Sequence, residues 1–206
     1  ILIDDAHGFG YMGPTGAGAD EAQGCQQDIE LYFSSMVKSL GSLGGFICGP
    51  KAVIKYLRYN TRSQIFAKSM PLMVVEGMLK RMDMIKTMPE LREKLWYNVN
   101  KLQTGLKERG FDIGGTNSPV TPIFMKGDVP EATQMVMDLR ENYHIFCSIV
   151  VYPVIPKGDI IYRLIPTAAH SDADIDETLK AFEETKKKLD AGVYKAVDIP
   201  DMAEAN

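Results

Sequence analysis

The chain has 206 residues, of which 45% are hydrophobic and 24% charged, with a formal net charge of -4. This composition predicts a globular protein with a sizeable core in one or two domains, and its acidic balance argues against nucleic acid as a partner. The three cysteines lack C-x-x-C spacing, so the sequence suggests neither a disulfide framework nor a metal site, and it fits a reducing, cytoplasmic location. No apolar run in it approaches the roughly 20 residues of a membrane span.

The first residues of the sequence have the pattern of a buried strand with no segment before it. Ile1 to Ile3 form a short apolar, β-branched run followed by two carboxylates, which is typical of the carboxyl end of a strand in a parallel sheet. Because natural chains start with Met and seldom begin on a buried strand, we expect this to be the C-terminal part of a longer protein. A glycine-rich loop from Gly8 to Gly18 follows.

Two more strands are expected in this half, at residues 30–34 and 44–49, with Lys38 in the loop between them. Pro50 starts a helix that runs to about residue 59. Residues 71–109 follow a helical pattern that breaks at Met88-Pro89. Four methionines in this stretch fall roughly at helical spacing, which predicts core packing: Met73, Met78, Met82 and Met84.

After Gly110 the pattern changes to a β-α-β-β-α order, typical of a small α+β domain with its helices on one face. Strands are expected at 120–125, 145–153 and 159–166, and helices at 130–143 and 172–189. We therefore expect three regions. Residues 1–105 belong to a larger domain with connecting helices, 106–189 to the small domain, and 190–206 to a loose tail.

The opening stretch ILIDDAHGFGYMG admits three chemical interpretations. Its glycines spell the dinucleotide-binding pattern G-x-G-x-x-G, but the last one runs into Pro14 and more glycines, which start a helix poorly. Asp4 to His7 approach the DEAH box of helicases, but the sequence contains no phosphate-binding G-x-x-x-x-G-K-[ST] loop. In the third interpretation, a carboxylate and a histidine at a strand end hold a cofactor.

Lys38 favours the third interpretation. Its small and apolar neighbours predict partial desolvation, which would lower its pKa and favour the neutral amine that forms a Schiff base. Asp4 would keep a pyridine nitrogen protonated, and His7 would touch the ring or its phenolic oxygen. These three residues form the set that pyridoxal phosphate requires.

The stretches DDAHGFGYMGPTGAG and SSMVKSLGSLGG resemble two motifs of the α-oxoamine synthases, which are pyridoxal-phosphate enzymes of fold type I. A third family motif, R-x-x-x-[ST]-A-x-H, stands at Arg163 to His170. The three motifs occur in the family's order over nearly the whole chain. Within the family, YNTRSQIFAKSMP and FCSIVVYPVIPKGDIIYRLIPTAAH are similar to the bacterial serine palmitoyltransferase branch, and cysteate-using relatives would look similar.

This resemblance implies an α/β fold: the C-terminal part of a fold-type I transferase, with the remainder of a mostly parallel sheet domain and a small α+β domain. It implies an acyltransferase that condenses an amino acid, expected to be serine, with an acyl-CoA and loses carbon dioxide to give a 2-amino ketone of the 3-ketosphinganine type. A homodimer with the active site at its interface is implied, with peripheral membrane contact for the lipid product. This chain alone is not expected to be active.

The family's residue roles carry over to six positions. Lys38 matches the Schiff-base lysine and general base, Asp4 the partner of the pyridinium nitrogen, and His7 the contact to the phenolic oxygen and substrate carboxylate. The other three are Ser35 for the cofactor phosphate, Ser69 for the partner subunit's phosphate, and Arg163 for the substrate carboxylate.

Val37 and Met36 depart from the small residue and the Phe usual before the lysine, which leaves two alternatives open: altered reactivity or an inactive variant. Asp4, His7, Arg163 and His170 also have purely structural interpretations, as a turn cap, a loop histidine, a surface arginine and a helix cap. The alternatives for the whole protein are 2-amino-3-ketobutyrate CoA ligase, a fold-type I aminotransferase, and a non-catalytic fragment.

Overall fold

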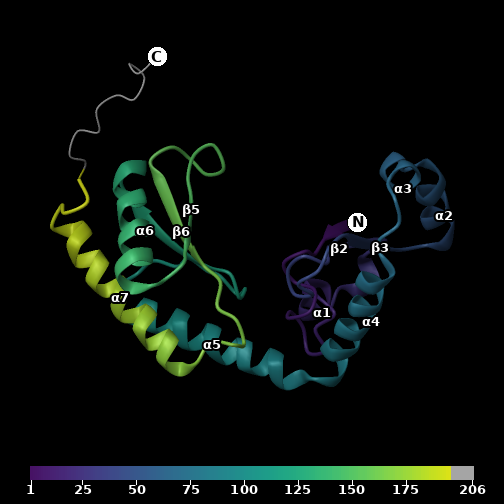
Figure 1. Ribbon diagram of the computed structural model, residues 1–206, viewed down its shortest axis with the longest axis horizontal. Coiled ribbons are helices and arrows are strands. Elements are labelled where there is room, and N and C mark those ends of the chain that lie inside the picture. Colours follow the sequence, from purple (N-terminus) through teal and green to yellow (C-terminus); the bar gives the residue numbers. More distant parts are fainter. Residues whose placement is uncertain (196–206) are drawn as a thin grey trace, which may run out of the picture. The chain divides into compact units, whose positions relative to one another are not determined.

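The computed structural model describes residues 1–195, which form two compact units (Figure 1). The first is Ile1–Glu93, and the second begins at Lys94. The division falls within helix α5 (Pro89–Glu108), a little earlier than the boundary expected after residue 105. Most of the expected tail, residues 196–206, lies outside the described residues.

The first unit is built on a three-stranded sheet in the order β1 (Leu2–Asp4), β2 (Leu31–Ser35) and β3 (Gly45–Cys48). These are the three expected strands. β1 and β2 are parallel, whereas β3 runs antiparallel to β2. The connection between β2 and β3 is too short for the crossover that a parallel pair needs, which explains the reversal.

Two of the first unit's helices were expected and two short ones were not. The expected pair, α2 (Lys51–Asn60) and α4 (Leu72–Thr87), each follow a proline at the N-cap position. The unexpected pair are α1 (Ala19–Gln23) and α3 (Arg62–Phe66), and a 3₁₀ turn lies at Gln26–Asp28. Helices α1 and α3 have only five residues each and no capping side chain, so the sequence gives little indication of where they begin or end.

A small apolar cluster joins α4 to the loop after β2. Met36, Leu40 and Met78 are buried there, and partly buried side chains pack around them, among them Met82. The expectation of core packing is therefore confirmed for Met78 and Met82. It is wrong for Met73, which is 78% exposed in the first turn of α4.

The second unit follows the expected β-α-β-β-α order after the end of α5. Its elements are β4 (Thr121–Lys126), α6 (Val129–Tyr143), β5 (Ser148–Val150), β6 (Asp159–Leu164) and α7 (Asp172–Asp190). The sheet has the order β4-β6-β5 with antiparallel pairing throughout. β5 is shorter than expected because the chain turns at Val151, whose carbonyl accepts the Val154 N–H at 3.0 Å.

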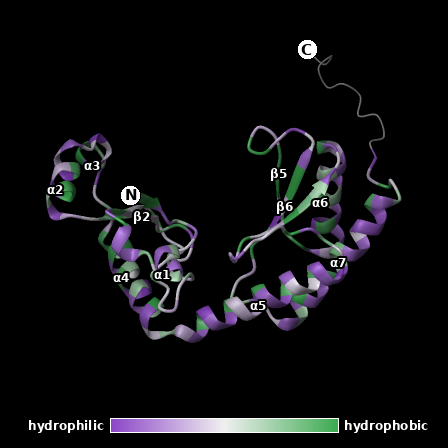
Figure 2. Ribbon diagram, turned by 180° about the vertical axis from the view of Figure 1, so that it is seen from behind, coloured by the Kyte–Doolittle hydropathy of each residue, from purple (hydrophilic) through white to green (hydrophobic). Residues whose placement is uncertain are grey.

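Helices α6 and α7 lie side by side in this unit (Figure 1). Figure 2 shows hydrophilic and hydrophobic residues alternating along α7, as in a helix with one buried face. On that face Phe182 is fully buried. Gly105 of α5 allows close packing here, because a Cβ at that position would lie 2.4 Å from Leu179 Cδ1.

Tyr194, four residues after α7, belongs to this core, which corrects the expectation of a loose tail at that position. Tyr194 is 6% exposed and packs in the apolar cluster of the unit. Its hydroxyl donates to Asp138 of α6. No helix within residues 1–195 is both long enough and apolar enough to cross a lipid bilayer.

Candidate active site

The first unit places four of the predicted site residues near one edge of its sheet. Asp4 is the last residue of β1, and His7 lies in the turn that follows. Ser35 is the last residue of β2, and Lys38 follows three residues later. Because β1 and β2 are parallel, their carboxyl ends lie at the same edge, which is where open α/β sheets hold their ligands.

The two neighbouring carboxylates, Asp4 and Asp5, have different environments. Asp4 is exposed, and the contact found for its carboxylate among the described residues is the Ala6 N–H at 3.1 Å. Asp5 is only 5% exposed, and its Oδ2 accepts the Ala19 N–H at 2.9 Å and the Tyr32 hydroxyl at 2.5 Å. Asp4 does cap a local turn, but it retains acceptor capacity for a ligand, whereas Asp5 is committed to the fold.

The glycine-rich loop packs tightly against the Asp5 carboxylate. A Cβ on Gly8 would lie 2.0 Å from Asp5 Oδ1, and one on Gly18 would lie 2.1 Å from Asp5 Oδ2. Helix α1 begins only at Ala19, well after the G-x-G-x-x-G pattern, so no helix N-terminus stands at Gly13 to receive a pyrophosphate. The glycines are loop formers, and the dinucleotide interpretation has no structural support.

Two further side chains hold the tip of this loop, and the sequence did not single them out. Glu21 accepts hydrogen bonds from the Thr15 N–H at 3.0 Å, the Thr15 hydroxyl at 2.7 Å and the Ala17 N–H at 3.1 Å. Burial alone would raise the pKa of Glu21, but these hydrogen bonds and the Arg92 charge lower it. Arg92 donates to the carbonyls of Pro14 at 2.5 Å and Thr15 at 3.2 Å.

Lys38 is exposed in this chain, so the expected desolvation is not observed. Its apolar neighbours explain the difference: Met36 and Leu40 are buried in the cluster with α4, and they leave Lys38 on the outside of the loop. Met36 is thus a core residue. Val37 is 52% exposed and does not enclose the lysine.

The two predicted phosphate-binding serines, Ser35 and Ser69, stand in different segments of this unit. Ser35 is half-buried opposite Gly45, and its hydroxyl oxygen accepts the Val37 N–H at 3.3 Å. Ser69 is exposed in the segment between α3 and α4, and no hydrogen-bond partner is found for its side chain among residues 1–195.

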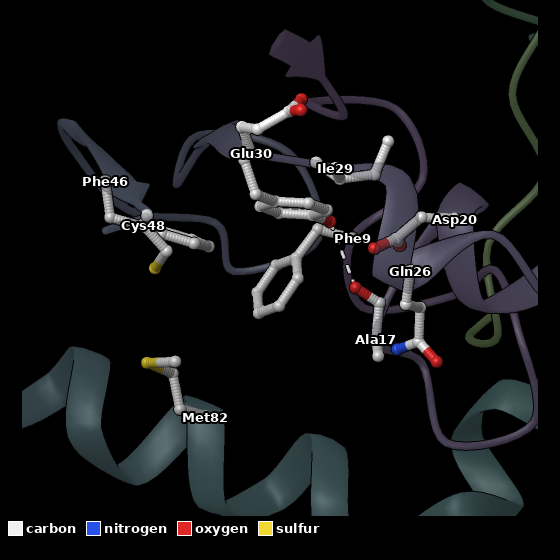
Figure 3. Close-up of a pocket in the computed structure, with 11 residues that line it drawn as sticks. Phe9, Ala17, Asp20, Gln26, Ile29, Glu30, Phe46, Cys48 and Met82 are labelled. Carbon is white, nitrogen blue, oxygen red and sulfur yellow. Dashed lines mark hydrogen bonds between the residues drawn. The ribbon is translucent and has the colours of Figure 1, made fainter. Parts of the chain in front are cut away.

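A pocket of about 430 Å³ lies on the other face of the same sheet (Figure 3). Tyr32, Phe46 and Cys48 line it from β2 and β3, with Phe9 from the loop and Met82 from α4. Side chains alternate along a strand, and Asp4 pairs with Phe33 whereas Tyr32 pairs with Ile3 and Cys48. The pocket therefore faces away from the Asp4 side.

The second unit carries Arg163, which is exposed on β6. Its Nε donates to the Ser148 hydroxyl at 3.2 Å across the β5–β6 pair. No hydrogen bond is found for its terminal nitrogen atoms within the described part of the chain. His170 closes the turn before α7, where its Nδ1 accepts the Thr167 N–H at 3.0 Å, while Ser171 provides the helix cap.

Residues 1–182 match the family model described as aminotransferase class I and II. The chain belongs to this family. Cysteate-C-fatty acyltransferase of Capnocytophaga ochracea is 59% identical over 198 residues, which cover 96% of this chain and 47% of that protein. Serine palmitoyltransferase of Bacteriovorax stolpii is 35% identical, with 92% of this chain and 45% of that protein covered. 8-Amino-7-oxononanoate synthase of Petrotoga mobilis is 34% identical, with 92% and 48% covered.

Solved structures agree with these relatives. A structure of serine palmitoyltransferase with PLP superimposes with a TM-score of 0.85 at 30% identity, covering 92% of this chain and 48% of that one. The resemblance to α-oxoamine synthases and the fold-type I α/β fold are thereby confirmed. The chain spans about half the length of the curated relatives it matches.

Proposed function

We propose that this protein is a pyridoxal-phosphate-dependent C-acyltransferase that condenses an amino acid with an acyl-CoA, releasing CoA and carbon dioxide and forming a 2-amino ketone. The observation that carries this proposal is the placement of an exposed carboxylate, Asp4, and an exposed amine, Lys38, at the carboxyl ends of neighbouring parallel strands. The family membership and the 59% identity to an acyltransferase support it.

The residues present fit the cofactor. Asp4 keeps acceptor capacity beyond its contact with the Ala6 N–H, and no partner is found for the Lys38 amine among residues 1–195. Ser35 adds a hydroxyl at the end of β2 for the phosphate. Pyridoxal phosphate, when bound, supplies an electron sink for the negative charge that develops at the amino acid's Cα.

Each residue then has a defined task. Lys38 holds the cofactor aldehyde at rest and later takes the Cα proton on Nζ, while Asp4 holds a proton at the pyridine nitrogen. Cα attacks the thioester carbonyl, so a C–C bond forms and the CoA thiolate leaves. The bond from Cα to the carboxylate then breaks, carbon dioxide departs, and Cα takes back a proton.

Arg163 and His7 orient the amino acid for these steps. A guanidinium fork binds a carboxylate through two parallel hydrogen bonds, and Ser148 occupies only the Nε of Arg163. His7 lies in the turn that follows β1, where it serves the phenolic oxygen and the substrate carboxylate. We propose a homodimer in which Ser69 binds the partner subunit's phosphate, and sedimentation at the mass of a single chain would contradict this.

The amino acid that we propose is cysteate, because the relative at 59% identity carries that substrate in its name. Serine is the second candidate, since serine palmitoyltransferases are 35–37% identical to this chain. CoA release from a fatty acyl-CoA, measured with each amino acid in turn, decides between them. A higher kcat/KM with cysteate is expected, and a higher value with serine would reverse the assignment.

The role of Lys38 is tested by absorption spectroscopy of the full-length protein loaded with cofactor. The wild type is expected to absorb in the visible range, and Lys38→Ala is expected to lose that band. Lys107→Ala, which removes an exposed lysine from α5, is the matched control and should keep it. A band that persists unchanged in Lys38→Ala would refute the assignment.

A further inference from the structure

A partly buried group of hydrogen bonds joins β2 to the end of β1 and to the glycine-rich loop. The Tyr32 hydroxyl, which carries a single proton, donates to Asp5 Oδ2 at 2.5 Å and lies 3.0 Å from the Ala17 carbonyl oxygen. Burial, followed by the hydrogen bond to Asp5, raises the pKa of Tyr32, so the hydroxyl stays protonated and acts as the donor. We call this the Asp5–Tyr32 pair.

The backbone of Asp5 is fixed as firmly as its side chain. Its N–H donates to the Phe33 carbonyl at 2.8 Å, and its carbonyl accepts the N–H groups of Gly8 and Phe9, each at 3.1 Å. The buried Ser34 hydroxyl donates to the same carbonyl at 3.3 Å. His7 thus lies in a turn whose two ends, Asp5 and Gly8, are both held.

Tyr32 acts from the face of the sheet that is turned away from Asp4. Its ring stacks on Phe46 at a centroid distance of 6.2 Å and meets the Phe9 ring edge-on at 6.4 Å. Figure 3 shows the Phe9 ring beside the hydrogen bond that reaches Ala17. These ring contacts do not need the hydroxyl, so Tyr32→Phe removes one hydrogen bond and leaves the packing.

We propose that Asp5 and Tyr32 are positioning residues for His7, which set the place and orientation of its imidazole in the reaction. This inference rests on the proposed function for its kinetic consequence. A misplacement of about 1 Å at a reacting group costs up to about a hundredfold in rate. Loss of the Tyr32 hydroxyl is therefore expected to lower kcat by about tenfold to a hundredfold in the loaded enzyme.

A double-mutant cycle separates positioning from a general structural effect. If Tyr32 acts through His7, Tyr32→Phe should change kcat by less than about twofold once His7→Ala is present. Tyr97→Phe removes a hydroxyl that donates to Asp172 at 2.7 Å in the second unit, and this control should leave kcat unchanged. An equal loss from Tyr32→Phe with and without His7 would overturn the proposal.

If the wild type releases no CoA from acyl-CoA with any amino acid, the proposed function fails. A second measurement then still tests the role of the Asp5–Tyr32 pair. In the cofactor-free protein, the Gly8 and Phe9 amides that bond to Asp5 should exchange with solvent at least about tenfold faster in Tyr32→Phe. The His7 imidazole resonances should shift in the same variant. Unchanged exchange and unchanged resonances would overturn the role of the pair.

Discussion

Asp4 and Asp5 are neighbours in the sequence, and the structure predicts opposite consequences for replacing them. Asp5→Ala removes the acceptor of two hydrogen bonds in a buried setting, from Tyr32 and from the Ala19 N–H. Hydrogen bonds to charged groups each contribute about 1.5–3 kcal/mol, so the free energy of unfolding should fall by about 3 kcal/mol or more. Asp4→Asn keeps an oxygen for the Ala6 N–H at an exposed site, and its cost should stay within about 0.5 kcal/mol.

The assay is urea unfolding of the cofactor-free protein, followed by circular dichroism, for the wild type and both variants. Cofactor binding is then measured by visible absorption. Asp4→Asn is expected to fold normally and to bind or use the cofactor poorly, whereas Asp5→Ala is expected to unfold at lower urea. Equal destabilisation by Asp4→Asn and Asp5→Ala, or wild-type stability of Asp5→Ala, would contradict the different roles of the two carboxylates.

Two further predictions concern the second unit. Burial by itself would raise the pKa of Asp138, but hydrogen bonds from Lys188 and Tyr194 lower it below the ordinary value of 3.8. The contribution of the Asp138 carboxylate to the stability of the fold is therefore complete above that pH, and it is lost as pH falls toward the folded pKa. Asp138→Asn should therefore lower the free energy of unfolding by about 1–3 kcal/mol at pH 7. Thermal unfolding should show this difference from the wild type shrinking below about pH 4, and a constant difference down to pH 3 would contradict the prediction. Burial raises the pKa of the Cys147 thiol to about 11. A thiol reagent at pH 8 should therefore label exposed Cys48 and spare Cys147 in the native protein. Equal labelling of the two cysteines, measured by mass spectrometry, would contradict this prediction.

Much of the fold followed from local patterns. The strand that ends at Asp4, the helices that start after Pro50 and Pro71, and the β-α-β-β-α order of the second unit all have strong periodicity or clear start signals. The reversed direction of β3 is a consequence of the short loop after β2. The five-residue helices α1 and α3 could not be predicted, because so short a segment shows no complete period.

The candidate site could be predicted only in part, because it depends on contacts between residues that are distant in the sequence. Asp4 and Lys38 could be placed at strand ends because parallel strands share an edge. The Asp5–Tyr32 pair joins residues 27 positions apart, and only the register of β1 on β2 shows that they meet. The exposure of Lys38 depends on which of its apolar neighbours pack under α4, and composition around a lysine does not determine that.

We propose that the protein forms a carbon–carbon bond with loss of CoA and carbon dioxide. The most direct measurement incubates the full-length protein, loaded with pyridoxal phosphate, with a fatty acyl-CoA and either carboxyl-labelled cysteate or carboxyl-labelled serine. The products are quantified by mass spectrometry. We predict CoA, labelled carbon dioxide and a 2-amino ketone in equal amounts. A keto acid formed without CoA release, or no labelled carbon dioxide with either cysteate or serine, would contradict the account.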